Sequence, residues 1–395
     1  MVQDNVVSFE DTSKAFSHKS DGELRKMHML FSLMNWKHPA KIGTYFVKSA
    51  LKYKLPVKTL VKNTLFRQFC GGESLEECRP LIHRLKSFNI KVIPDYAAEG
   101  EKSEEGFNQT FENVLDTVDF AGKEKNIAFA VFKVSGMGSG LLLEKVQAGS
   151  PLNEKENEDF SDLSEKINII CHRAEELDVS VMIDAEESWI QGSIDVLAYS
   201  MMNKYNKKKA IVYNTFQMYR ADMLNNLRDA IAIARKGGFF LGVKLVRGAY
   251  IDIERKRAET KGYRSPIWDT KKETDLAFNQ ALELCIQNLD HVALLCGSHN
   301  EDSNLYLSDL MMKHAVAFDD KRVFFSQLYG MGDHISFNLA SAGFNVAKYV
   351  PYGPVEAAMP YLFRRANENQ AMMGQTSREL NLIKKEISRR NSATE

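Results

Sequence analysis

The spacing of hydrophobic residues changes near residue 90 of the chain. Before that point, segments 24–34, 39–53 and 57–72 place apolar residues at helical intervals and show no strand pattern. Ser74 and Glu77 are spaced as in a capping box, which predicts the start of a further helix. Residues 1–88 are therefore predicted to form an N-terminal helical region.

From residue 91 onward, short β-branched and aromatic runs alternate with longer stretches of helical spacing. The runs cover residues 91–97, 127–135, 179–186, 210–216, 240–250, 291–299, 322–330 and 345–353. Such apolar runs separated by helices are typical of parallel strands covered on both faces. Eight units predict an α/β fold, a (βα)8 TIM-type barrel over residues 89–374. A doubly wound sheet is the alternative, but the GxGxxG fingerprint is missing after the first run.

Composition narrows the functional classes. Lysine plus arginine equals aspartate plus glutamate at 52 each, which argues against nucleic-acid binding. The five cysteines are widely spaced without a metal-binding pattern, so we expect no metal site and a reducing compartment. No apolar run has the length of a membrane span, and the acidic start lacks a targeting pattern. We therefore expect a soluble protein that is at most peripheral to a membrane, with residues 375–395 forming a charged tail, a partly frayed helix.

Polar residues collect where the predicted strands end. In a barrel the carboxyl ends of the strands carry the chemistry. Each residue alone has an ordinary structural explanation, such as solvation or helix capping, but buried charges at a packed barrel mouth need partners or a ligand. Together they predict a polar pocket of mixed charge, formed by Lys133, Asp184, Asn214, Lys244, Arg247, Ser298, His299, Gln327 and Tyr349.

The last predicted helix of the barrel carries a pair of arginines. Tyr361, Arg364, Arg365 and Glu368 are spaced so that they share one helical face. A guanidinium pair matches a carboxylate bidentately, which favours a substrate such as an amino acid. An exposed basic helix that pairs internally with Glu368 is the alternative, and the neighbouring tyrosines favour the substrate site.

Seven segments resemble the proline dehydrogenase family, particularly its forms in eukaryotes and related bacteria. They occur in family order across about residues 90–370: AVFKVSG, MIDAEE, YNTFQMYR, GVKLVRGAY, CGSHN, SQLYGMGDHISF and YVPYGPVEAAMPYLFRRANEN. The resemblance implies a distorted barrel that binds FAD at the carboxyl ends of its strands, with the final helix over the mouth.

The resemblance also implies roles for the charged residues. Lys133, Arg364 and Arg365 are similar to the cations that hold the carboxylate of L-proline and orient its ring over the flavin. Asp184 and Lys244 resemble the catalytic positions beside the flavin. Lysine at position 244 departs from the arginine of many bacterial members, and it can donate to flavin N5 as a point charge.

Further residues are expected to contact FAD or the proline ring. The FAD contacts implied by the resemblance are Asp184, Ala185, Asn214, Lys244, Arg247, Gly248, Ala249, Ser298, His299 and Glu368. The ring would lie against Tyr250, Leu328, Tyr349 and Tyr361. Because a tyrosine at 349 would crowd a ring hydroxyl, we expect proline to be preferred over hydroxyproline.

The implied reaction is oxidation of L-proline to Δ1-pyrroline-5-carboxylate, the first step of proline catabolism, with the flavin reoxidised by a quinone. We expect transient contact with a membrane surface and a separate pyrroline-5-carboxylate dehydrogenase. The expected location is cytoplasmic or at the bacterial inner membrane, or mitochondrial for a processed eukaryotic protein. The alternatives are a hydroxyproline dehydrogenase, a Schiff-base lyase or aldolase that uses Lys133 or Lys244, and a non-catalytic member of the family.

Overall fold

The computed structural model describes residues 7–34, 62–97, 102–359, 362 and 373–393. The chain divides into two compact units, one made of Met1–Glu99 with Gln327–Glu395 and the other of Gly100–Ser326. The helix predicted over 39–53 lies outside the described residues. The domain boundaries at 88 and 374 stay a prediction.

Eight strands form at the eight predicted runs. They are β1 (Ile90–Tyr96), β2 (Phe129–Phe132), β3 (Ser180–Ile183), β4 (Val212–Gln217), β5 (Leu241–Val246), β6 (Val292–Gly297), β7 (Val323–Leu328) and β8 (Val346–Tyr352). β2 to β7 pair in parallel, each with its neighbour in sequence, and β1 pairs in parallel with β8. The sheet order is β1-β8-β7-β6-β5-β4-β3-β2. With helices between the strands, this confirms the predicted (βα)8 fold.

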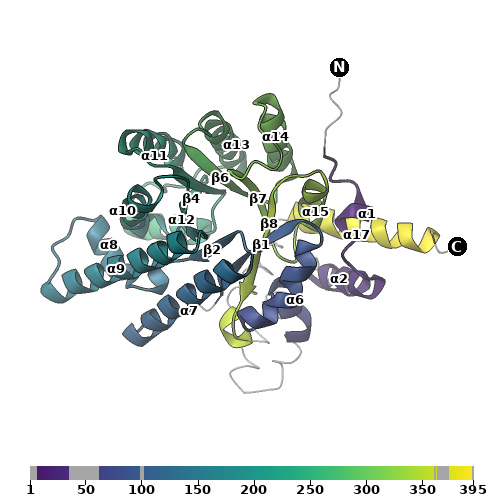
Figure 1. Ribbon diagram of the computed structural model, residues 1–395, viewed down its shortest axis with the longest axis horizontal. Coiled ribbons are helices and arrows are strands. Elements are labelled where there is room, and N and C mark those ends of the chain that lie inside the picture. The colour runs from purple at the N-terminus through teal and green to yellow at the C-terminus, as the bar shows by residue number, and fades with distance from the viewer. Residues whose placement is uncertain (1–6, 35–61, 98–101, 360–361, 363–372, 394–395) are drawn as a thin grey trace. The chain divides into compact units, whose positions relative to one another are not determined.

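The unit of residues 100–326 places its helices around β2 to β6 (Figure 1). They are α7 (Glu104–Lys123), α8 (Gly140–Gln147), α9 (Glu154–Glu176), α10 (Ser188–Tyr205), α11 (Met223–Gly237), α12 (Ile251–Lys261), α13 (Lys271–Gln287) and α14 (Glu301–Lys313). Local sequence fixes several helix starts, as in the capping boxes Asn153–Glu156 and Thr270–Glu273. β4 is buried at all six positions, which explains its continuous apolar run.

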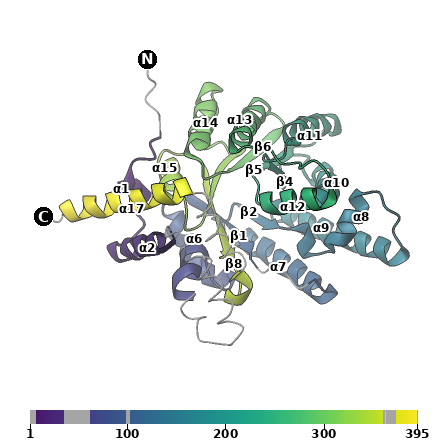
Figure 2. The ribbon, with the colours of Figure 1, turned by 180° about the vertical axis from the view of Figure 1, so that it is seen from behind.

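α12 and α10 are joined by a buried carboxylate. Glu254 of α12 accepts hydrogen bonds from the backbone N–H of Ser188 at 2.6 Å and from its hydroxyl at 2.7 Å. This contact caps the first turn of α10, where N–H groups lack helical partners. α12 accordingly lies beside α10 and β4 in the view of Figure 2.

In the other unit, the helices are α1 (Thr12–Ala15), α2 (Asp21–Met34), α5 (Arg67–Phe69), α6 (Leu75–Lys86), α15 (Asp333–Ser341) and α17 (Met373–Ser392). α2 confirms the helix predicted over 24–34, and the described part of 57–72 forms a π-helical turn at Lys62–Phe66 followed by α5. Ser74 caps α6 as predicted. The Glu77 side chain, however, accepts from the N–H of Glu73 at 3.0 Å, one residue before the cap.

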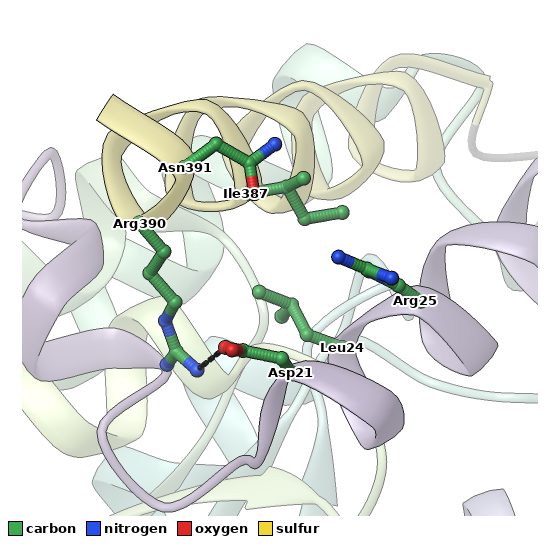
Figure 3. A pocket seen from close by; sticks show the side chains of 6 residues that line it. All are labelled: Asp21, Leu24, Arg25, Ile387, Arg390 and Asn391. Carbon is green, nitrogen blue, oxygen red and sulfur yellow. Dashed lines mark hydrogen bonds and ion pairs between the residues drawn. The ribbon is translucent and has the colours of Figure 1, made fainter. Parts of the chain in front are cut away.

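The charged tail is held against the N-terminal helices. Leu382 and Ile383 of α17 are buried together with Leu24 and Phe31 of α2, because the apolar residues of the tail recur at helical spacing. Arg390 of α17 donates to Asp21 at the start of α2 at 2.8 Å (Figure 3). The helix prediction for the tail is confirmed, and the buried face limits its fraying.

Candidate active site

A buried ion pair joins the ends of β3 and β5. Lys244 of β5 donates from Nζ to Oδ1 of Asp184 at 2.5 Å, and the two side chains are 8% and 14% exposed. Asp184 follows β3, and its backbone N–H donates to the carbonyl of Phe132 at the end of β2 at 2.9 Å. A nearly buried lysine and aspartate satisfy each other here, as the cost of burying charge requires.

Arg247, one residue beyond β5, forms a corner with β6, α13 and α14. Its Nε donates to Asp275 at 2.6 Å, and its two terminal nitrogens donate to Ser298 at 2.8 Å and to Ser303 at 2.9 Å. The guanidinium carbon lies 4.4 Å from the ring centroid of Phe278. This leaves two of the five N–H donors of the guanidinium for a ligand. The N-terminus of α14 lies beside Ser298, so the corner suits a phosphate or carboxylate group.

Gly248 is required next to this corner by two independent features. Its φ is +128°, a region that residues with a side chain rarely adopt, and a Cβ would lie 2.5 Å from the ring of Tyr219. The following residue, Ala249, is exposed. The backbone of the VRGAY segment can therefore approach a ligand closely.

The strand register separates Asn214 from the other candidate residues. Thr215 pairs with Lys244, so the residues of β4 on the same face as Lys244 are Tyr213, Thr215 and Gln217. Asn214 lies on the opposite face, where its Nδ2 donates to Asp195 of α10 at 2.7 Å. Burial raises the pKa of Asp195, and the Asn214 hydrogen bond opposes that rise. Asn214 thus ties β4 to a helix.

Gln217 is the residue of β4 that lies among the candidate site residues. It is 3% exposed, and its Nε2 donates to the carbonyl of Glu186 at 2.7 Å. Its Oε1 accepts from the N–H of Ala249 at 3.4 Å. Gln217 bridges the segments that follow β3 and β5. Sequence reasoning singled out Asn214 and missed Gln217, which lies one residue beyond the predicted run of residues 210–216.

Lys133 follows β2 and precedes the 3-10 turn Val134–Gly136, where it is half-buried. Ser135 in this turn donates to the carboxylate of Glu186 through its N–H at 2.9 Å and also through its hydroxyl. Burial raises the pKa of Glu186, and these two bonds oppose the rise. Glu186 thus fixes the turn that carries Lys133.

Tyr250 precedes α12, and burial raises its pKa to about 12.

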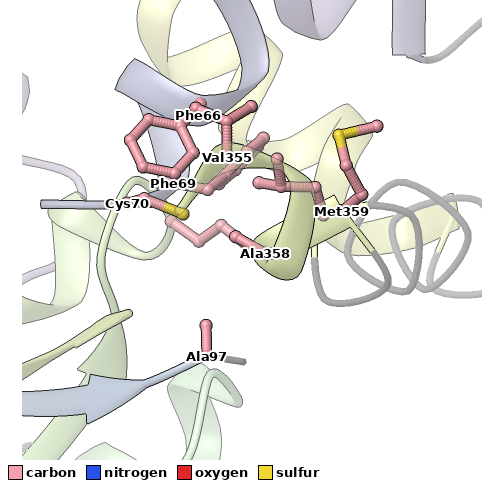
Figure 4. Packing of buried hydrophobic residues seen from close by; sticks show 9 residues of the cluster. Phe66, Phe69, Cys70, Ala97, Val355, Ala358 and Met359 are labelled. Carbon is pink, nitrogen blue, oxygen red and sulfur yellow. The ribbon is translucent and has the colours of Figure 1, made fainter. Parts of the chain in front are cut away.

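The remaining candidates have simpler surroundings. Ala185 directly follows Asp184 and is buried, and His299 directly follows Ser298 and is half-buried. In the other unit, Leu328 ends β7 and packs against an apolar cluster, which Figure 4 shows. The cluster consists of Phe66, Phe69, Cys70, Ala97, Met331, Val355, Ala358, Met359 and Leu362. Tyr349 of β8 is half-buried. Tyr361, Arg364, Arg365 and Glu368 lie outside the described residues.

The described part of the chain shows neither a cluster of metal ligands nor a membrane-spanning helix. No group of three or more His, Cys, Asp or Glu residues there could hold a metal ion. None of the helices in those same ranges is long and apolar enough to cross a membrane. All five cysteines are buried thiols, and burial raises the pKa of Cys78 and Cys296 to about 12.

These features define a (βα)8 barrel that carries a buried lysine–aspartate pair and an arginine–serine corner at the carboxyl ends of its strands. Residues 78–378 match the proline dehydrogenase family, and the chain belongs to that family. Members of the family are flavoenzymes that oxidise proline, so the protein is an oxidoreductase of this class.

Individual relatives agree with the family match. The chain is 32% identical to the mitochondrial proline dehydrogenase 1 of Dictyostelium discoideum, over 96% of this chain and 74% of that protein. It is 29% identical to the hydroxyproline dehydrogenase of Xenopus laevis, over 98% of this chain and 90% of that protein. The structure is similar to that of proline utilization A from Bdellovibrio bacteriovorus inactivated by N-propargylglycine. The TM-score is 0.73 at 19% identity, over 90% of this chain and 38% of that chain.

Proposed function

We propose that this protein oxidises L-proline to Δ1-pyrroline-5-carboxylate, with FAD as the acceptor of the hydride. The observation that carries the proposal is the placement of Lys244–Asp184 and Arg247–Ser298 at the ends of β3, β5 and β6. One pair offers a buried cation beside a carboxylate, and the other offers donors for a phosphate. A flavin dinucleotide needs both kinds of surroundings, one at its ring and one at its pyrophosphate.

The chain's own residues fit FAD. Arg247 and Ser298 would hold the pyrophosphate with the α14 N-terminus, and Gly248 would let the backbone approach it. His299, which follows Ser298 in the sequence, would lie toward the adenosine of FAD. Lys244 would donate to the ring nitrogen that receives the hydride, with Asp184 holding the ammonium in place. The FAD, when bound, supplies the two-electron acceptor.

We assign to Gln217 the contact that β4 makes with the flavin ring. The side chain of Asn214 is occupied by α10, on the face of the strand away from Lys244. Gln217 shares the face of Lys244 and touches both flanking segments. Ala185 and Glu368 remain assigned to FAD from the family resemblance.

Substrate binding is assigned to the cations and aromatic residues of the family motifs. Lys133, Arg364 and Arg365 would hold the carboxylate of proline, which places the ring without acid–base chemistry. The ring would lie against Tyr250, Leu328, Tyr349 and Tyr361.

The electron acceptor and the location belong to the same proposal. A quinone would reoxidise the flavin, which implies transient contact with a membrane surface, and a separate pyrroline-5-carboxylate dehydrogenase would consume the product. Relatives named as mitochondrial support a mitochondrial location for a eukaryotic source. A bacterial protein would act in the cytoplasm or at the inner membrane.

A Schiff-base reaction is the weaker alternative for Lys244. The Nζ of Lys244 is held in an ion pair with Asp184 at 2.5 Å and would have to leave that carboxylate to attack a carbonyl. A hydroxyproline dehydrogenase is the second alternative, because one relative carries that name. The half-buried Tyr349 favours the ring without a hydroxyl.

The test is the visible spectrum of the purified protein before and after L-proline is added without oxygen. Bleaching of the flavin absorbance by proline, and slower bleaching by trans-4-hydroxyproline, supports the proposal. Faster bleaching by hydroxyproline would reassign the substrate. A colourless protein that is trapped by borohydride with a carbonyl substrate would replace the proposal by the Schiff-base reaction.

A further inference from the structure

A second buried lysine lies on β8, next to Tyr349 in sequence. The Lys348 side chain is 0% exposed, and its Nζ is 2.8 Å from Oδ1 of Asp333 at the start of α15. The same ammonium donates to the carbonyl of Met331 at 2.6 Å and to that of Leu328 at 3.4 Å. Its three N–H donors therefore have three acceptors, all in the segment from the end of β7 to α15.

A histidine from the N-terminal region completes this charged cluster. Nε2 of His18 is 3.2 Å from the second carboxylate oxygen of Asp333, and both side chains are 4% exposed. The His18 ring stacks on Phe337 of α15 with ring centroids 3.8 Å apart. Burial alone would raise the pKa of Asp333, but Lys348 and His18 hold it well below its ordinary value. The carboxylate is thus ionised and paired on both sides.

Stability alone gives little reason for this cluster. Replacing a buried ion pair by apolar residues of similar volume is often neutral or stabilising. An apolar residue at position 348 could not, however, donate to the carbonyls of Leu328 and Met331. The cluster therefore does something that packing cannot do: it fixes the backbone that follows β7.

The end of β7 and strand β8 carry two residues that are assigned to the lining of the substrate site, Leu328 and Tyr349. Leu328 ends β7, and its carbonyl accepts from Lys348. Tyr349 follows Lys348 on β8 and projects from the opposite face of the strand. The backbone carbonyl of Tyr349 accepts from the N–H of Tyr329 at 2.8 Å. The position of Leu328 relative to Tyr349 is therefore set by backbone bonds in which Lys348 takes part.

We propose that Lys348 is a positioning residue that sets the spacing of Leu328 and Tyr349 around the substrate ring, with Asp333 as its counter-charge and His18 holding that carboxylate from its other side. The inference rests on the proposed function and deepens it, because it names what controls the choice between proline and hydroxyproline. Through His18, the segment before residue 78 would also contribute to substrate specificity.

The experiment compares FAD-loaded wild-type protein with Lys348→Met, with the double variants Asp333→Asn/Lys348→Met and Asp333→Asn/Lys348→Gln, and with Lys385→Met. Lys385 forms an exposed pair with Glu10 at 3.5 Å in the same unit, so its variant is the control. Thermal midpoint, flavin content, and kcat and KM for L-proline and trans-4-hydroxyproline are measured for each. The double variants remove both charges of the Lys348–Asp333 pair, so neither charge is left without the other, and the variants are expected to fold.

A misplacement of about 1 Å far from the reacting atoms can cost ~100-fold in rate. Leu328 and Tyr349 are assigned to the substrate ring and not to the reacting atoms. We therefore expect about a tenfold rise in KM for proline, a small change in kcat, and a smaller preference for proline over hydroxyproline. Asp333→Asn/Lys348→Met should recover the thermal midpoint relative to Lys348→Met while KM stays high. Asp333→Asn/Lys348→Gln keeps an N–H donor for the Met331 carbonyl and should regain part of the KM.

Two results would overturn the inference. If Asp333→Asn/Lys348→Met regained KM and substrate preference together with its thermal midpoint, the cluster would be structural only. If both double variants kept wild-type KM and preference, Lys348 would have no positioning role. The wild-type protein tests the proposed function separately, because a flavin that neither imino acid bleaches would refute it before any variant is compared.

Discussion

Replacing Asp184 by asparagine should destabilise the barrel strongly, because it leaves a charged lysine in a nearly buried place. Lys244 and Asp184 are 2.5 Å apart and only 8% and 14% exposed. Removing one partner of a buried ion pair costs ~3–5 kcal/mol, and the amide oxygen of asparagine still accepts a hydrogen bond. We therefore expect Asp184→Asn to lower the free energy of unfolding by about 3 kcal/mol.

The matched control is Asp159→Asn on α9. Asp159 pairs with Lys155 at 2.9 Å, but the two side chains are 46% and 67% exposed. Water screens the charges of an exposed pair of this kind, so Asp159→Asn should change the free energy of unfolding far less than Asp184→Asn does. The two variants remove the same charge from the same unit and differ in burial.

The assay is urea unfolding at pH 7, followed by tryptophan fluorescence with and without saturating FAD. The chain has three tryptophans, and Trp36 belongs to the other unit. With Trp36→Phe in every variant, the signal comes from Trp189 and Trp268 of the unit of residues 100–326, which holds the pair. Adding Lys244→Met to Asp184→Asn should restore most of the lost stability without restoring activity. The reasoning is refuted if Asp184→Asn costs no more than Asp159→Asn.

Two further variants test other parts of the site, and a third tests a buried carboxyl group of α17. Gly248→Ala must adopt a φ of +128° and place Cβ 2.5 Å from Tyr219, so it should lose FAD on gel filtration, whereas Gly140→Ala, with no atom within 4 Å of its Cβ, should keep it. Tyr349→Ala should raise the ratio of kcat/KM for hydroxyproline to that for proline, and an unchanged ratio would contradict the steric argument. Burial raises the pKa of Glu379 from 4.5 to about 7, so the folded state binds the extra proton and wild-type stability falls as pH rises between these values. Glu379→Gln should then be more stable than wild type by ~2–3 kcal/mol above pH 7, and a gain of equal size at pH 4.5 in chemical unfolding would refute the assignment.

The eight strands could be predicted because each is an apolar run of β-branched and aromatic residues. Burial on both faces makes such a run visible, and all eight strands lie within or one residue beyond the predicted runs. The same property hides which residues face inward. In β4, where all six positions are buried, alternation gives no signal, and only the pairing of Thr215 with Lys244 separates Gln217 from Asn214.

Contacts between distant segments were beyond sequence reasoning for a different reason. Lys348 stands inside a predicted strand, and its partners Asp333 and His18 come from α15 and from the N-terminal region. Nothing local marks the three as neighbours. The bridge between Gly72 and Tyr352, in a region predicted as purely helical, has the same origin.

The two buried lysine–aspartate pairs involve different strands, β5 and β8, and they have different roles in the proposed site. Lys244 and Asp184 share the face on which the cofactor is assigned, so their charges can act on bound ligands. Lys348 projects from the face of β8 opposite Tyr349, where it pairs with Asp333 of α15 and donates to the backbone carbonyls of Leu328 and Met331. If both interpretations hold, substitutions at Lys244 will alter the flavin and its chemistry. Substitutions at Lys348 will alter which ring is accepted and leave the flavin spectrum as it is.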